Sequence, residues 1–252
     1  MDMHGKRAIR RHNGDMSKII TVASPKGGVG KTTIAYELAY LLGAPLVDLD
    51  WDQGNSTRQW GYRHEDRQRA PLLDALELGR APVPMKGARK PDLVPCHPEF
   101  GTNQPEVEDM AAALGKWAGE WGRRYVVVDT HPGFTGSSLG AMNAASVVVT
   151  PAVFKTKELE ALDGMLADMP DYPLLLVPNM VPPIPPGPEL KRLTQMVERA
   201  EVHVAPPISR HEWLGRRKLR VALTSYDPEP IRVQRVADQL RAAAQAVKSY
   251  GH

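Results

Sequence analysis

The residues with the clearest chemical meaning lie in a glycine-rich segment near the start of the chain. Its sequence is Pro25-Lys26-Gly27-Gly28-Val29-Gly30-Lys31-Thr32-Thr33. Glycines, which lack a Cβ, allow successive backbone N–H groups to converge on phosphate oxygens. At this spacing Lys31 is placed to reach the β- and γ-phosphates of a nucleotide, and the Thr32 hydroxyl to bind Mg²⁺. The pattern therefore predicts a nucleotide-binding loop.

Carboxylates that suit a metal or a water molecule follow two other apolar runs. Asp48, Asp50 and Asp52 lie at and just after the run 45–50, and Asp129 ends the run 125–130. An aspartate that ends a buried strand is typical of a Walker B element, in which the carboxylate holds Mg²⁺ directly or through water. Because parallel strands place ligands at their carboxyl ends, these aspartates are expected to converge on the glycine-rich loop.

The elements that must position these residues can be read from the apolar runs. β-Branched runs with little alternation, typical of strands buried on both faces, occur at 18–24, 45–50, 125–130, 146–151, 173–178 and 202–206. Helical patterns lie at 34–42, 106–121, 158–169, 188–200 and 229–249. This alternation predicts an α/β fold with a doubly wound, mostly parallel sheet covered by helices on both faces. We expect a flexible basic tail at 1–17 and a single domain at 18–252 that carries the nucleotide-binding loop.

Composition excludes several classes of protein. Hydrophobic residues make up 42% and charged residues 24% of the 252 residues, as in an ordinary globular protein. Cys96 is the only cysteine, which excludes an internal disulfide or an all-cysteine metal site. No apolar stretch approaches the roughly 20 residues that span a bilayer. We expect a soluble, cytoplasmic protein.

The glycine-rich segment departs from the ordinary P-loop pattern, since Pro25 stands where that pattern has glycine and Lys26 precedes the glycine pair. This is the deviant Walker A form, and from about residue 18 to 249 the chain resembles the ParA/MinD family of P-loop ATPases. It is most similar to the small ParA-type DNA partition ATPases. The resemblance implies ATP and Mg²⁺ as cofactors and a homodimer that closes on ATP. It also implies that Lys26 reaches the phosphates of the partner's ATP.

The resemblance also assigns roles to residues after the strands. Family members have an Asp-x-Asp-Pro-Gln-Gly-Asn stretch whose second aspartate orients the attacking water. This chain has one more residue there and no proline, so the two ends of the stretch give different alignments. Counting forward from the strand assigns the role to Asp50, which we favour. Counting back from Gln53 places the position at Trp51 and leaves Asp52 as the alternative carboxylate. Asn179 matches the position of an adenine contact. The predicted metal ligands are Thr32, Asp48 and Asp129. His131 stands where the family usually has proline.

A basic patch follows the last predicted strand. Residues 209–220 contain five basic residues against one acidic residue, Glu212, whereas the chain as a whole has a net charge of only +3. Such residues neutralise DNA phosphates without reading the sequence. Three of the arginines have a spacing that predicts one shared helical face. The predicted DNA-binding residues are Arg210, Arg216, Arg217, Lys218 and Arg220.

Together these features predict a ParA-like partition ATPase, associated with the nucleoid, that binds double-stranded DNA non-specifically. A ParB-like partner would stimulate its slow hydrolysis. One alternative is a MinD-like membrane-cycling ATPase, but the alanine-rich segment 235–252 has a weak apolar face, so no stable membrane association is expected. Positioning of a cargo other than DNA is a second alternative, and a small-molecule enzyme with a P-loop is a third.

Overall fold

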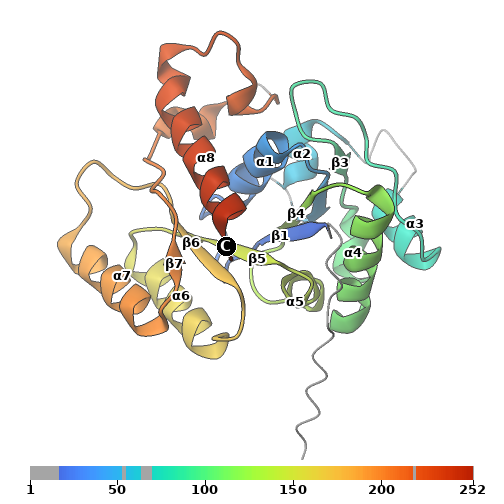
Figure 1. The fold of residues 1–252 in the computed structure, drawn as a ribbon, viewed down its shortest axis with the longest axis horizontal. Helices are drawn as coiled ribbons and strands as arrows, with labels where there is room; N and C mark the ends of the chain where they lie inside the picture. The colour runs from blue at the N-terminus through green and yellow to red at the C-terminus, as the bar shows by residue number, and fades with distance from the viewer. Residues whose placement is uncertain (1–16, 53–54, 64–69, 218–219, 252) are drawn as a thin grey trace, which may run out of the picture.

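A seven-stranded parallel sheet forms the centre of the molecule in the computed structural model, which describes residues 17–52, 55–63, 70–217 and 220–251 (Figure 1). The strand order is β3-β2-β4-β1-β5-β6-β7, and every pairing between named strands is parallel. The strands are β1 Lys18–Val22, β2 Leu46–Leu49, β3 Leu93–Val94, β4 Tyr125–Thr130, β5 Val147–Ala152, β6 Leu174–Pro178 and β7 His203–Val204. The doubly wound α/β prediction is confirmed.

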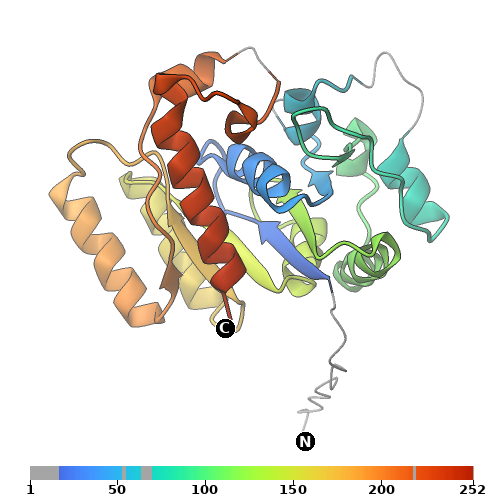
Figure 2. The same cartoon turned by 45° about the horizontal axis from the view of Figure 1, so that its top comes forward.

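Helices cover both faces of this sheet (Figures 1 and 2). They are α1 Lys31–Leu42, α2 Ser56–Trp60, α3 Pro71–Glu77, α4 Val107–Trp121, α5 Gly136–Asn143, α6 Thr156–Asp168, α7 Gly187–Ala200 and α8 Ile231–Ser249. Helices α1 and α8 lie side by side on one face, where Ile20 and Val22 of β1 share their core. Helices α4 to α7 cover the other face, and Ile19 and Val126 point toward it. Neighbouring residues of a strand thus enter opposite cores, as a sheet buried on both sides requires.

Several short elements were not expected from the sequence. Helix α5 carries too little apolar periodicity to be recognised, and it forms because Thr135 caps its N-terminus and Gly140 allows close packing on α4. A Cβ on Gly140 would lie 2.5 Å from the carbonyl oxygen of Val107. Strand β3 has only two residues, and helices α2 and α3 are short. Elements of this length are specified mainly by their tertiary neighbours.

The basic tail expected at 1–17 lies outside the described residues, apart from Ser17. Among the helices that the structure describes, none combines the length and apolar character needed to cross a membrane.

Candidate functional site

The predicted nucleotide-binding loop joins the carboxyl end of β1 to the first residue of α1. Gly28 and Gly30 have φ values of +74° and +92°, a backbone conformation that is strained for residues with a Cβ. A Cβ on Gly30 would also lie 2.3 Å from the side-chain nitrogen of Asn179. The loop therefore needs glycine at position 30 for two reasons, its backbone angle and its contact with the end of β6.

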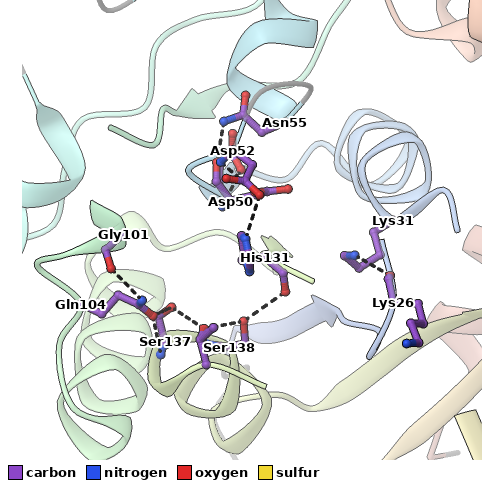
Figure 3. Close-up of polar contacts among 12 residues, drawn as sticks. Lys26, Lys31, Asp50, Asp52, Asn55, Gly101, Gln104, His131, Ser137 and Ser138 are labelled. Carbon is purple, nitrogen blue, oxygen red and sulfur yellow. Dashed lines mark hydrogen bonds and ion pairs between the residues drawn. The ribbon is translucent and has the colours of Figure 1, made fainter. Parts of the chain in front are cut away.

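The two lysines of the loop occupy different environments. Lys31 is 5% exposed, and its Nζ donates a hydrogen bond of 3.2 Å to the carbonyl oxygen of Lys26 (Figure 3). Burial lowers the pKa of Lys31, while the nearby carboxylates of Asp129 and Asp50 act to raise it. The side chain of Lys26 is exposed and leads away from Lys31. Lys31 therefore faces the interior of the site, and Lys26 is free to meet a group outside its own chain.

Asp48 and Asp129 sit side by side because β2 and β4 pair in a register that aligns them. Both are fully buried. Burial, followed by the charge of Asp129, holds the pKa of Asp48 well above its usual range. Burial also raises the pKa of Asp129 to about 7, while the hydroxyl of Ser56 and the charge of Lys31 oppose that rise. Two adjacent buried carboxylates favour a cation or a shared proton.

The donor set fits a magnesium ion at Asp129. The Oδ2 of Asp129 accepts a 2.8 Å hydrogen bond from Ser56, whereas its buried Oδ1 has no hydrogen-bond partner among the described residues. The Thr32 side chain lies within hydrogen-bonding reach of the same carboxylate. A hydroxyl and a carboxylate oxygen are ligands that Mg²⁺ prefers. Asp129 and Thr32 are therefore the two protein groups best placed to hold the ion.

The carboxylate of Asp48 accepts more hydrogen bonds than that of Asp129. Its Oδ2 accepts hydrogen bonds of 2.6 Å from both the backbone N–H and the hydroxyl of Thr57, and its Oδ1 accepts one of 3.1 Å from the N–H of Asp50. By accepting these three hydrogen bonds, Asp48 fixes the segment after β2 to the start of α2. Its geometry suits ligation through a water molecule rather than direct contact with the ion.

Asp50 and Asp52, the two candidates for positioning the attacking water, differ in their burial and in their contacts. Asp50 is 8% exposed, and its charge acts on Lys31. The side chain of Asp52 is 64% exposed and lies 3.0 Å from Nε2 of His131 (Figure 3). The imidazole of His131 in turn stacks on Trp51, with ring centroids 3.9 Å apart. This arrangement favours Asp50 as the residue that faces the phosphates.

A pocket of about 290 Å³ opens beside the glycine-rich loop. Asn179 lines it, and its amide nitrogen donates a 2.8 Å hydrogen bond to the carbonyl oxygen of Val29. Thr33 of the predicted loop also lines the pocket, together with residues that the sequence did not assign to the nucleotide, including Met180, His211 and Leu214. The position of Asn179 is compatible with the predicted base contact, and its amide also braces the loop.

The structure separates the residues of the predicted DNA patch. Arg210 lines the pocket beside the loop and pairs with Glu212 at 3.1 Å. A 3₁₀ helix spans Glu212–Arg216 and ends there, since Arg217 has an extended backbone. The prediction of one helical face for Arg216, Arg217 and Arg220 is therefore wrong. Lys218 lies outside the described residues.

Arg217 and Arg220 are held by contacts that a helical face would not have made. Arg217 is half-buried, and its guanidinium donates a 2.6 Å hydrogen bond to the carbonyl oxygen of Val221. The carbonyl oxygen of Arg220 accepts a 2.7 Å hydrogen bond from the hydroxyl of Tyr36 in α1. Arg216 and Arg220 are exposed. The basic run that follows Gly215 carried no periodic signal for this irregular path.

Other residues of the site were also missed. Ser56 and Thr57 hold the two buried aspartates, and Asn55 caps α2 by accepting a hydrogen bond of 3.0 Å from the N–H of Arg58. The sequence Asn55-Ser56-Thr57 is a recognisable helix start, so a capping pattern directly after the acidic segment was the available signal.

Comparisons with known proteins agree with this geometry. Residues 17–170 match the family model described as an AAA domain. The chromosome-partitioning ATPase Soj of Thermus thermophilus is 34% identical over 166 residues, which cover 64% of this chain and 65% of Soj. The chromosome partitioning protein ParA of Caulobacter vibrioides is 29% identical over 165 residues, covering 59% and 61%. The matches thus span less than two thirds of these relatives' lengths.

Solved structures show the same fold. The MinD cell division protein of Aquifex aeolicus superimposes with a TM-score of 0.66 at 21% identity, over 89% of this chain and 95% of that one. The glycine-rich loop with its second lysine, the buried aspartates at the strand ends and these sequence matches lead to one family. The chain belongs to the ParA/MinD family of P-loop ATPases.

Proposed function

We propose that this chain is a ParA-type partition ATPase that binds ATP with Mg²⁺ and forms a sandwich dimer. In the ATP state the dimer binds double-stranded DNA without sequence preference and so associates with the nucleoid in the cytoplasm. A ParB-like partner stimulates hydrolysis, which releases the dimer from DNA. The cycle segregates plasmid or chromosomal DNA. Residues 18–252 act as the single ATPase domain of this cycle.

The observation that carries the proposal is the buried cluster of Lys31, Asp50 and Asp129 at the carboxyl ends of β1, β2 and β4. Lys31 provides a positive charge where the β- and γ-phosphates of ATP would lie. Asp50 is placed to orient a water molecule for attack on the γ-phosphate. When bound, Mg²⁺ neutralises charge on the phosphate oxygens. Such a site lowers the barrier mainly by positioning and charge stabilisation.

The exposed Lys26 supports dimerisation across ATP. Its side chain is exposed, makes no ion pair within the described part of the chain and points away from Lys31 (Figure 3). In the proposed dimer it neutralises phosphates of the nucleotide held by the other subunit. ATP thus links two copies of the chain, whereas ADP offers one phosphate fewer.

Membrane cycling finds less support. The apolar residues of α8, including Val236, Leu240 and Val247, are buried in the core that α8 shares with α1. Insertion into a bilayer would require this face to leave the protein. We therefore favour DNA over a membrane as the surface on which the ATP state assembles.

The first experiment measures binding to two unrelated DNA duplexes by fluorescence anisotropy, with Mg²⁺–ATP, with Mg²⁺–ADP and without nucleotide. We expect binding that requires ATP, that is equal for both sequences and that falls steeply with salt. Lys31→Ala is expected to abolish both binding and ATP-dependent dimerisation, whereas Lys157→Ala, an exposed lysine of α6, is the matched control. Unchanged DNA binding by the Lys31 variant would contradict the ATP switch.

A further inference from the structure

Three cations from two distant segments of the chain lie on one surface, which we call the Arg89 surface. It consists of Arg89 and Lys90, from the loop before β3, and Arg220. The N–H of Ala222 donates a 2.8 Å hydrogen bond to the carbonyl oxygen of Arg89, which joins the two segments directly. Arg220 is near enough to Lys90 that, after burial, its charge helps to lower the pKa of Lys90. The surface therefore concentrates positive charge that the sequence distributes widely.

The loop that carries Arg89 and Lys90 is firmly held. Asp92 pairs with Lys86 at 2.6 Å and accepts a 3.2 Å hydrogen bond from the N–H of Gly87. A Cβ on Gly87 would lie 2.3 Å from the carbonyl oxygen of Lys90, so the turn closes only with glycine there. The indole of Trp60 donates a 2.8 Å hydrogen bond to the carbonyl oxygen of Pro91. These contacts present the two cations in a fixed position.

Arg89 and Lys90 each make a cation–π contact with an aromatic ring. The Nζ of Lys90 lies 3.5 Å from the centre of the Trp60 ring, and the guanidinium of Arg89 lies 5.1 Å from that of Tyr226. Arg217 approaches the same tyrosine at 5.9 Å. Cation–π contacts of this kind restrict the side chains, and Lys90 also donates a 2.9 Å hydrogen bond to the carbonyl oxygen of Trp60, which leaves its other N–H groups for an anion. A restricted donor loses less entropy when it binds an anion.

The cations of the Arg89 surface differ from other cations of the described residues in their ion pairing. Within the described ranges, none of its three cations pairs with a carboxylate, whereas Arg192, Arg199 and Arg241 all do. Neighbouring cations without carboxylates repel one another, and a bound polyanion relieves that repulsion. Clustered, unpaired cations thus favour an anionic partner.

The backbone of Arg89 is a second, independent sign of function. Its φ is +58°, in the left-handed region that glycine adopts freely and other residues adopt at an energetic cost. Glycine at this position would relieve the strain. Residues held in sparsely populated conformations concentrate at functional sites. A strained arginine on an unpaired cationic surface suggests that its guanidinium is needed there.

We propose that Arg89, Lys90 and Arg220 contact the phosphate backbone of duplex DNA. This inference rests on the DNA-binding function proposed above and extends the contact surface to a loop outside the predicted basic patch. Duplex DNA suits the surface better than a bilayer, because Trp60 and Tyr226 are half-buried beneath the cations. None of the large apolar side chains that stand exposed in the described residues lies in 86–90 or 220–226. Contact is therefore electrostatic rather than by insertion.

The test compares wild type with the double variant Arg89→Gly/Lys90→Gln. Glycine relieves the left-handed backbone, and glutamine keeps a donor for the 2.9 Å hydrogen bond from Lys90 to the carbonyl oxygen of Trp60. The variant loses the contacts of the Arg89 and Lys90 side chains with Tyr226 and Trp60, so a small decrease in the midpoint of thermal unfolding is expected, whereas binding of a fluorescent ATP analogue should match wild type. The matched control, Lys157→Gln/Lys191→Gln, removes two exposed charges from α6 and α7.

DNA binding is measured with Mg²⁺–ATP across a salt series on two unrelated duplexes. Each phosphate contact contributes roughly 0.9 to the slope of log K against log salt. We expect the double variant to reduce that slope by about 2 equally on both duplexes, and the control to keep the wild-type slope. If wild type binds DNA and the double variant shows the same salt slope as wild type, the proposed role of the Arg89 surface is wrong, while the proposed DNA-binding function stands.

Two other results separate this inference from the function on which it rests. If wild type binds no duplex in any nucleotide state, the proposed DNA-binding function fails first. Vesicles of phosphatidylglycerol and phosphatidylcholine provide the second comparison. ATP-dependent flotation of wild type that the double variant loses, without duplex binding, would assign the surface to a membrane and overturn the proposal.

Discussion

The imidazole of His131 stacks on the indole of Trp51, with the ring planes 1° apart and the centroids separated by 3.9 Å. Trp51 follows β2 and His131 follows β4, so the stack joins the two segments that carry Asp50 and Asp129. Trp51 also packs closely on Gly101, since a Cβ there would lie 2.9 Å from the indole. The stack therefore connects the segments that follow β2 and β4.

Replacing His131 should loosen this connection. We expect His131→Ala to reduce the free energy of unfolding by about 1 kcal/mol, the typical contribution of an aromatic pair, and to alter the rate of ATP hydrolysis. Urea unfolding and phosphate release measure the two effects. His203→Ala is the control, because His203 contacts the Tyr250 ring at 5.4 Å, away from the site. A similar change in hydrolysis for both variants would argue against a specific role for the stack.

Asp50 and Asp52 should differ in their effects on hydrolysis. Asp50→Asn removes the carboxylate that faces Lys31 and is expected to lower kcat roughly 100-fold while ATP still binds. Asp52→Asn changes an exposed carboxylate that contacts His131 and should have a much smaller effect. Phosphate release at saturating Mg²⁺–ATP distinguishes the two variants, and binding of an ATP analogue shows whether each retains its nucleotide. Equal losses would return Asp52 to consideration as the residue that positions the water.

The buried Asp129 should make the stability of the metal-free, nucleotide-free protein depend on pH. Because its pKa is raised to about 7, the folded state holds a proton that the unfolded chain releases near pH 4. The stability associated with this group is present below pH 4 and is lost as pH rises toward 7. We therefore expect Asp129→Asn to be more stable than wild type above pH 7, by up to roughly 4 kcal/mol, with little difference near pH 4.

Urea unfolding in EDTA at a series of pH values measures this difference. Asparagine can keep the hydrogen bond from Ser56, so the comparison isolates the charge. A variant that is less stable than wild type at every pH would show that the Asp129 carboxylate stabilises the fold through its contacts. The same variant should bind Mg²⁺–ATP poorly, since it lacks a carboxylate beside Thr32.

Arg216 and Arg217 are adjacent in sequence but should behave differently. Arg217→Ala removes the hydrogen bond to Val221 and the contact with Tyr226, and we expect it to lower the free energy of unfolding by about 1–3 kcal/mol. Arg216→Ala changes an exposed side chain and should alter stability by less than about 0.5 kcal/mol. Thermal and urea unfolding of both variants test this. Equal stability would show that the inward contacts of Arg217 contribute nothing measurable.

The sequence by itself determined the phosphate loop, six of the seven strands and the long helices along the chain, and the aspartates at strand ends. These are local properties, since glycine spacing and runs of β-branched residues specify their own backbone conformation. The family followed from Lys26 and Pro25, two neighbouring residues. Each of these features needs only a short window of sequence, and each agrees with the fold.

Only the tertiary structure decided which distant residues meet. The register of β2 against β4 places Asp48 beside Asp129, and the path after β7 turns Arg217 inward instead of onto a helical face. The same path places Arg220 next to Lys90. Such contacts depend on how strands and loops pack around one another, and no periodicity in the sequence records that. The electrostatic environment of each site residue follows from this packing, because burial and neighbouring charges set its pKa.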